Sequence, residues 1–288
     1  MDMKAQILLN NGLLRSVASI YAWQEGLQLN GTSGLLEENK QVLLAHRIVS
    51  EDLKLLDKRF GYTCYEHYRQ NLEPEYFDTL LMKESIHRES ILDLCCGGGA
   101  TIRALLNHEP RIIYGIDSDA EQLQLLQSVY SSMRGMNTQL VTKVSDAHSI
   151  PLDNECVDMA VCRVALHYLN ENLVLTDIYR ILRPHGKLFL LVHGIGYIYH
   201  YLFTRKRIFS KQMIHFLYNH GVRRNPISHS LNQRSSAKVL TIRQVKRLLA
   251  DSGFVNVQAY THSSMMILGK LPVYFAVVAE KSRTKDTR

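Results

Sequence analysis

The chain alternates short apolar runs with amphipathic stretches over most of residues 86–280. Three successive runs have the length of strands, and each carries an acid at or near its carboxyl end: Asp93, Asp117 and Asp146. Helical patterns separate these runs. The alternation predicts an α/β fold with a parallel sheet, whose ligand site lies at the carboxyl ends of the strands.

A glycine-rich turn follows the first run. The chain passes through Gly97, Gly98 and Gly99 into a stretch of helical pattern at 101–108. Such a junction lets a ligand lie against the backbone at a helix N-terminus. The acid at Asp117, 20 residues after Gly97, suits hydrogen bonds to ribose hydroxyls. Together with the other acids, it predicts one polar, adenosine-sized ligand.

A dinucleotide fingerprint fits this turn poorly, because Cys95 stands where its first glycine belongs and Asp146 is left without a role. The ordered segments instead resemble those of class I S-adenosylmethionine (SAM) dependent methyltransferases. The resemblance is closest to the small-molecule branch, which includes quinone C-methyltransferases and natural-product O-, N- and C-methyltransferases. The matching segments are 93–99, 115–118, 145–151, 156–169, 178–189, 241–254 and 274–280.

That resemblance implies a Rossmann-like, seven-stranded, mostly parallel sheet flanked by helices. The expected divisions are an N-terminal helical extension at 1–85, a SAM-binding domain at 86–280 with a helical lid inserted at 195–240 after the fifth strand, and a flexible basic tail at 281–288. Two residues depart from the family pattern. Cys95 replaces a glycine and is expected to shift the loop slightly, whereas His185 replaces a glycine in a surface turn.

The resemblance also implies roles for particular residues in binding SAM. They are Asp93 for the methionine amino group, Cys95, Gly97 and Gly99 for the loop under the cofactor, Asp117 and Ser118 for the ribose, Asp146 and Ala147 for the adenine, and Arg163 for the methionine end.

Two histidines follow predicted central strands and are candidate general bases, because the pKa of histidine lies near neutrality. They are His167 after the fourth strand and His193 after the fifth. A structural role remains open for each of them: His167 as the cap of a short helix, and His193 as a hydrogen-bonding partner of the backbone. The residues expected to contact the substrate are Tyr65, Tyr68, Tyr168 and Tyr197.

Residues before the cofactor domain are mostly helical in pattern, with apolar residues at helical spacing over 37–47 and 50–60. The stretch 195–240 is dense in aromatic residues and contains clusters of arginine and lysine. Long insertions of this kind are typical of lids and binding elements. We therefore expect this insertion to cover the methyl acceptor.

The bulk composition narrows the class of protein. With 288 residues, 46% hydrophobic and 21% charged, the chain is ordinary for a soluble globular protein. It lacks a signal-peptide pattern and a long apolar run, and its five cysteines include no C-x-x-C spacing. We predict a cytoplasmic protein with no membrane span and no metal site. Its net charge of +7 suits an anionic substrate, an acidic carrier protein or RNA.

The sequence therefore predicts SAM-dependent methyl transfer to an oxygen or nitrogen of a small, partly apolar metabolite, in natural-product or secondary metabolism. C-methylation of an alkene, a prenyl diphosphate or an aromatic carbon remains an alternative. Methylation of RNA or of an acidic carrier protein is another, although the chain shows no RNA-binding module, so nucleic acid is not expected. A non-catalytic fold and a homo-oligomer formed through the N-terminal helices or the lid also stay open.

Overall fold

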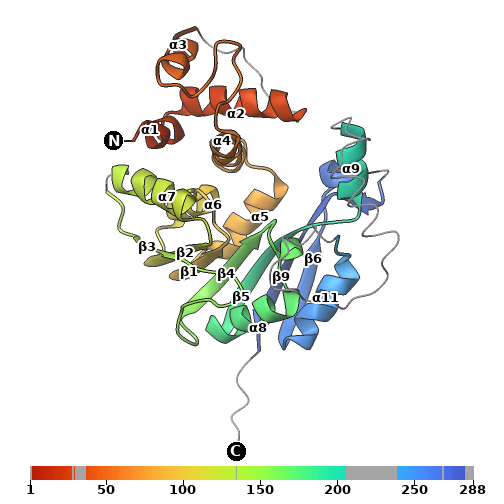
Figure 1. The fold of residues 1–288 in the computed structure, drawn as a ribbon. Helices are drawn as coiled ribbons and strands as arrows, with labels where there is room; N and C mark the ends of the chain where they lie inside the picture. The colour runs from red at the N-terminus through yellow and green to blue at the C-terminus, as the bar shows by residue number, and fades with distance from the viewer. Residues whose placement is uncertain are drawn as a thin grey trace, which may run out of the picture.

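The computed structural model describes residues 2–27, 29, 37–133, 135–204, 239–267 and 269–282. A seven-stranded sheet forms its centre, in the order β3-β2-β1-β4-β5-β9-β6 (Figure 1). The strands are β1 (Ser90–Leu94), β2 (Ile112–Asp117), β3 (Gln139–Val144), β4 (Val157–Arg163), β5 (Leu182–His193), β6 (Phe254–Tyr260) and β9 (Tyr274–Lys281). The first five are parallel, and β9 runs antiparallel to both β5 and β6. The predicted fold class is confirmed.

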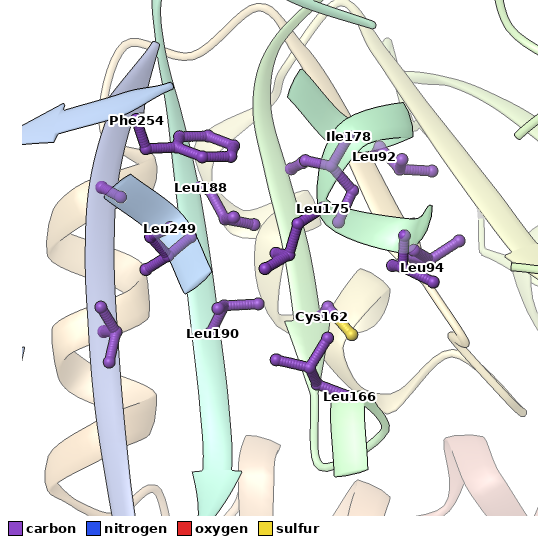
Figure 2. Close-up of a cluster of buried hydrophobic side chains, with 14 of the residues drawn as sticks. Leu92, Leu94, Cys162, Leu166, Leu175, Ile178, Leu188, Leu190, Leu249 and Phe254 are labelled. Carbon is purple, nitrogen blue, oxygen red and sulfur yellow. The ribbon is translucent and has the colours of Figure 1, made fainter. Parts of the chain in front are cut away.

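Helices cover both faces of this sheet, so its central strands are buried on two sides. In β5, Leu188 and Leu190 pack against α8 and α11 (Figure 2), whereas Phe189 and Leu191 belong to the cluster on the opposite face. The alternation follows from the two-residue period of a strand. The helices concerned are α5 (Tyr76–Ser85), α6 (Ala100–Leu105), α7 (Ala120–Ser132), α8 (Glu171–Ile181) and α11 (Ile242–Asp251).

The N-terminal segment builds a second core. Its helices are α1 (Met3–Leu9), α2 (Asn11–Glu25), α3 (Glu37–Ala45) and α4 (Lys58–Asn71). Their buried side chains pack together with Leu125 and Val129 of α7. Figure 1 shows α4 between α2 and the sheet. A domain boundary at residue 86 stays a prediction, and α5, which precedes it, packs Phe77 and Leu81 into the core of the sheet.

The predicted helix over 50–60 is wrong. This segment forms a turn closed by a bridge between Val49 and Leu55, with Leu53 in the left-handed region at φ 58°. The backbone N–H of Lys54 donates to the Ser50 hydroxyl at 3.1 Å, and the Ser50 N–H donates to the Lys54 carbonyl at 2.8 Å. Short polar side chains stabilise turns in this way at the expense of a helix.

The end of that turn offers a stability test. Asp57 caps α4, where its carboxylate accepts from the Phe60 N–H at 3.0 Å and from Lys4 Nζ at 2.7 Å. Asp57→Ala is expected to lower the free energy of unfolding by about 1 kcal/mol, chiefly through loss of the cap. Urea denaturation measures the change. Asp52→Ala, in the exposed turn, serves as the control, and equal stabilities for the two variants would contradict the assignment.

The fifth strand and the segment after it differ in part from expectation. β5 begins at Leu182 rather than near Lys187, and His185 takes a left-handed φ of 62° within it. The predicted lid starts with α9 (Gly196–Thr204), which lies beside the short strands β7 (Met266–Ile267) and β8 (Leu271–Pro272). Residues 205–238 of the predicted lid and 283–288 of the predicted tail lie outside the described residues. Within the described ranges, no helix combines the length and apolarity needed to cross a membrane.

Candidate functional site

A cleft of about 250 Å³ opens at the carboxyl ends of β1, β2 and β4. The sheet contributes Asp93, Asp117 and Arg163 to its lining, and the glycine-rich loop forms its floor. One face of α4 forms the opposite wall, through Tyr62, Glu66 and other residues spaced at helical intervals. The cleft therefore lies where the strand ends predicted a ligand, with the N-terminal extension as part of it.

The glycine-rich loop is built from left-handed backbone. Cys95, Gly97 and Gly99 have φ values of 61°, 51° and 81°. A side chain on Gly97 would project into open space, whereas one on Gly99 would collide with Leu126. Cys95 adopts the conformation expected of the glycine it replaces, and its N–H donates to the Ile116 carbonyl at 2.7 Å. The loop therefore presents bare backbone to the cleft at Gly97.

Asp117 holds this loop in place. Its Oδ2 accepts from the Gly97 N–H at 2.8 Å, and its Oδ1 accepts from the Asp119 N–H at 2.9 Å. Each carboxylate oxygen keeps a further lone pair for a ligand. Asp117 thus fixes the floor of the cleft and still offers two acceptors to a pair of vicinal hydroxyls.

Asp93 is the electrostatically unusual group of the cleft. Its side chain is buried, and no described residue hydrogen-bonds its Oδ2. Burial raises the pKa of Asp93 to about 7, with Arg163 opposing the rise and Asp117 adding to it. A buried carboxylate without a donor is unfavourable. An ammonium group at this position would donate to the carboxylate and offset the cost of its burial. Asp93 therefore fits the amino end of the predicted cofactor.

The raised pKa predicts a pH dependence. Below pH 7, an ammonium ligand must displace the proton of Asp93, so affinity for SAM is expected to fall about tenfold between pH 7 and pH 5.5. Isothermal titration in buffers of different ionisation enthalpy should also detect proton release at pH 6. An affinity that stays flat across this range in the wild type would contradict the role of Asp93.

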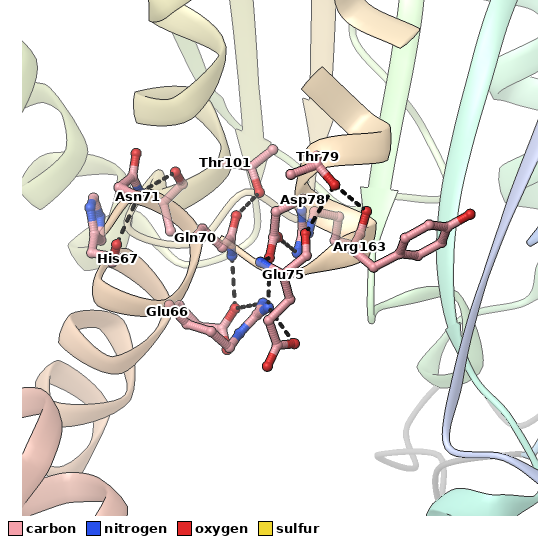
Figure 3. A network of polar contacts seen from close by, with 12 residues as sticks. Glu66, His67, Gln70, Asn71, Glu75, Asp78, Thr79, Thr101 and Arg163 are labelled. Carbon is pink, nitrogen blue, oxygen red and sulfur yellow. Dashed lines mark hydrogen bonds and ion pairs between the residues drawn. The ribbon is translucent and has the colours of Figure 1, made fainter. Parts of the chain in front are cut away.

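A network of buried charges joins the α4 wall to the sheet (Figure 3). Arg163 donates to Asp78 Oδ1 at 2.6 Å, and Arg69 donates to Asp78 Oδ2 at 3.2 Å. Glu66 Oε2 accepts from Arg69 at 3.1 Å and from Gln70 Nε2 at 2.8 Å. Asp78 therefore orients Arg163 in the lining of the cleft, and the predicted role of Arg163 at the methionine end stays a prediction.

The α4 wall also grips the glycine-rich loop. His67 Nε2 lies 2.9 Å from the Gly98 carbonyl and therefore donates to it. Burial lowers the pKa of His67 to about 4, so the ring is neutral at physiological pH. Asn71 donates to the Ala100 carbonyl at 3.0 Å. These residues were missed in the sequence, because a polar side chain on a helix does not reveal which loop it will meet.

The remaining residues predicted to bind the cofactor lie outside the lining of the cleft. Ser118 is exposed in the turn after β2, and Ala147 packs into the core of the sheet. The side chain of Asp146 is 72% exposed, and its Oδ1 accepts from the His148 N–H at 2.8 Å. Their adenine and ribose roles stay predictions.

The two candidate bases lie together. His167 is buried, without a hydrogen-bond partner for either ring nitrogen among the described residues, and burial lowers its pKa to about 4. Its ring centre lies 4.1 Å from those of both His193 and Tyr168, and His193 stacks on Tyr197 at 3.7 Å. The structure brings these four predicted residues to the ends of β4 and β5, beside the cleft rather than in its lining.

The tyrosines of α4 require a correction. Tyr68 is 1% exposed in the N-terminal core, its hydroxyl donates to Glu73, and it does not line the cleft. Tyr65 packs 5.7 Å from Tyr21 and is also absent from the lining. Helical rotation instead turns Tyr62 toward the cleft. We therefore remove Tyr68 from the substrate-contacting set and add Tyr62.

Comparison with known proteins agrees with this architecture. Residues 91–186 match the family model of a methyltransferase domain. An uncharacterized methyltransferase of Schizosaccharomyces pombe is 30% identical over 128 residues, which cover 44% of this chain and 48% of that protein. The match thus spans about half the length of this relative.

Two solved structures share the fold. A SAM-dependent methyltransferase of Methanosarcina mazei aligns with a TM-score of 0.51 and 19% identity, over 71% of this chain and 98% of that one. Phosphoethanolamine N-methyltransferase 2 of Haemonchus contortus, in complex with SAM, aligns with a TM-score of 0.54 and 12% identity, over 78% and 57% of the two chains. The family match over residues 91–186 and the shared fold show that this chain contains a methyltransferase domain with the fold of SAM-dependent methyltransferases.

Proposed function

We propose that this protein transfers a methyl group from SAM to an oxygen or nitrogen of a small, partly apolar metabolite. The buried, unpartnered carboxylate of Asp93 at the end of β1 carries this proposal. It fits the ammonium group of SAM, while the open space over Gly97 fits a ligand laid against backbone. Asp117 offers acceptors to the ribose hydroxyls, and Arg163 offers a guanidinium to the methionine carboxylate.

The charge of the cleft supports a cationic cofactor. The chain carries a net charge of +7, yet the lining contains four carboxylates, Glu66, Asp93, Asp117 and Asp119, against two guanidinium groups, Arg59 and Arg163. SAM carries a sulfonium and an ammonium against one carboxylate, so it is a cation overall. A lining with excess negative charge attracts such a ligand.

When bound, SAM supplies an activated methyl group: the acceptor lone pair forms the new bond to carbon as the electrons of the carbon–sulfur bond return to sulfur. The protein aligns the two reactants, and ideal alignment contributes on the order of 7 to 11 kcal/mol to lowering the barrier. His193 is the first proposed base for a hydroxyl or amine acceptor, and His167 the second, because burial lowers the pKa of His167 to about 4 and makes it a weaker base. A base of this kind adds about 10²- to 10⁴-fold.

Tyr168 and Tyr197, with Tyr62 from α4, are the proposed contacts for the acceptor. C-methylation of an alkene, prenyl diphosphate or aromatic carbon would not require a histidine base, so full turnover after replacing both His167 and His193 would favour it. Methylation of RNA or of an acidic carrier protein would instead show strong salt dependence. The cytoplasmic location and any homo-oligomer remain predictions.

Isothermal titration with SAM and with S-adenosylhomocysteine (SAH) tests the proposal. We expect both to bind with one site per chain, and SAM to bind more tightly than SAH at low salt because the lining favours the sulfonium. The preference should shrink as ionic strength rises, since partly exposed charges are screened. Absence of binding by both compounds would overturn the proposed function.

A further inference from the structure

Glu66 is the one carboxylate of the described cleft lining that the bound cofactor leaves without a role. Asp93 and Asp117 face the proposed ammonium and ribose. Asp119 caps α7, accepting from the Glu121 N–H at 3.1 Å, and forms an ion pair with Arg59. Glu66 lies on α4, across the cleft from the sheet, in the wall that the N-terminal extension contributes.

The geometry of Glu66 leaves one oxygen available. Oε2 accepts both described hydrogen bonds, from Arg69 and from Gln70 one turn along α4 (Figure 3). Within the part of the chain that the structure describes, no group donates to Oε1. A carboxylate that is oriented through one oxygen and open at the other is preorganised to accept a hydrogen bond from a ligand.

Glu66 also keeps its charge. Burial works against ionisation, but Arg69, Arg163 and the hydrogen bond from Gln70 together outweigh it, so the pKa of Glu66 lies below its ordinary value. Arg69 does not neutralise Glu66 alone, because the same guanidinium lies 3.2 Å from Asp78 and 3.9 Å from Glu75. Three carboxylates, Glu66, Asp78 and Glu75, thus lie around two guanidinium groups, Arg69 and Arg163, so negative charges outnumber positive ones in this network.

One tyrosine lines the cleft beside this carboxylate, and a second lies within its electrostatic reach. Tyr62 lies one turn before Glu66 on the same face of α4 and lines the cleft. Burial, Tyr197 and then Glu66 raise the pKa of Tyr274, the first residue of β9, so the phenol and the carboxylate lie within electrostatic reach of each other. The ring of Tyr197 is 5.9 Å from that of Tyr274. Ring faces next to a carboxylate favour an organic ammonium.

We propose that Glu66 binds the amino group of the methyl acceptor, and that the acceptor is an amine with an apolar body. This inference rests on the proposed function and selects nitrogen over oxygen. The ammonium form donates to Glu66 Oε1 while its apolar body lies against the tyrosines. Before transfer, the ammonium gives one proton to the histidine base proposed above, and its freed lone pair then forms the bond to the methyl carbon as the carbon–sulfur bond breaks.

Binding to the SAH-saturated protein tests this assignment, with phenethylamine as the probe and 2-phenylethanol as its uncharged analogue. By isothermal titration, we expect the wild type to bind the amine about tenfold or more tightly than the alcohol, as for a hydrogen bond to a charged group. Glu66→Gln, which keeps the shape of the side chain, should bring the two affinities to within about twofold. Its affinity for SAH should change little.

Glu75→Gln is the matched control. Glu75 shares Arg69 with Glu66 but does not line the cleft, so this variant should keep the preference for the amine. Equal binding of the two probes by the wild type, or a preference that survives in Glu66→Gln, overturns the inference while SAH binding leaves the proposed function standing. Failure of the wild type to bind SAH overturns both.

Discussion

Asp93→Asn is expected to stabilise the free protein and, in the same variant, to weaken its binding of SAM by about 10- to 100-fold. The loss of affinity follows from removing a charge-assisted hydrogen bond to the ammonium group, which contributes roughly 1.5–3 kcal/mol. The gain in stability follows from removing a buried carboxylate for which no described residue provides a donor.

The sign of the stability change follows from the pKa. In the folded protein Asp93 has a pKa of about 7, well above its value of 3.8 when unfolded. The unfolded chain therefore releases this proton first, and ionisation disfavours the folded state increasingly from pH 4 up to pH 7. We expect the Asp93→Asn substitution to raise the free energy of unfolding by about 1–3 kcal/mol at pH 8 and by little at pH 4.

Asp158→Asn provides the control on the same sheet. Asp158 is fully satisfied, because its Oδ2 accepts from the Ser90 N–H at 2.9 Å and its Oδ1 from Arg183 at 2.7 Å. This variant should lose stability and keep its affinity for SAM. If Asp93→Asn destabilised the free protein at pH 8 as Asp158→Asn does, the account of an unpartnered acid would be untenable.

Much of this site follows from local sequence, because strand ends carry their side chains to one edge of a parallel sheet. Asp93, Gly97 and Asp117 were placed in this way, and the structure brings them into one cleft. Cys95 was expected to shift the loop slightly, yet it takes the left-handed φ typical of the glycine it replaces. The seven-stranded, mostly parallel sheet follows from the family resemblance, and the structure confirms it.

The α4 wall did not follow from the sequence. Tyr65 and Tyr68 share the helical spacing expected of a binding face, yet the N-terminal core takes Tyr68, and Tyr62 and Glu66 face the cleft instead. Which face of a helix meets a ligand depends on the rotation set by distant packing. The false helix over 50–60 has a related cause, since its apolar spacing was outweighed by hydrogen bonds between Ser50 and Lys54.

Asp117→Ala is expected to reduce the affinity for SAM and for SAH by more than about 100-fold. Both ligands lose two hydrogen bonds from the ribose hydroxyls to a charged acceptor, each contributing roughly 1.5–3 kcal/mol. The loop is loosened as well, because the Gly97 N–H loses its acceptor at 2.8 Å. The two ligands should be affected equally, since they share the ribose. Isothermal titration gives both affinities.

Asp146→Ala is the comparison variant for the loss of affinity expected in Asp117→Ala. The Asp146 side chain is 72% exposed and lies outside the lining of the cleft, so its removal should weaken binding by less than about tenfold. Circular dichroism should show both variants folded. A larger effect from Asp146 than from Asp117 would mean that the ligand lies farther along the sheet edge than the cleft indicates.

The most direct measurement is a crystal structure of the protein with SAH. Our account predicts the SAH amino group at Asp93, directly or through one water, the ribose hydroxyls within hydrogen-bond distance of Asp117, and the chain of the ligand lying over Gly97. Density for SAH outside this cleft, or inside it with the amino group turned away from Asp93, would contradict the account.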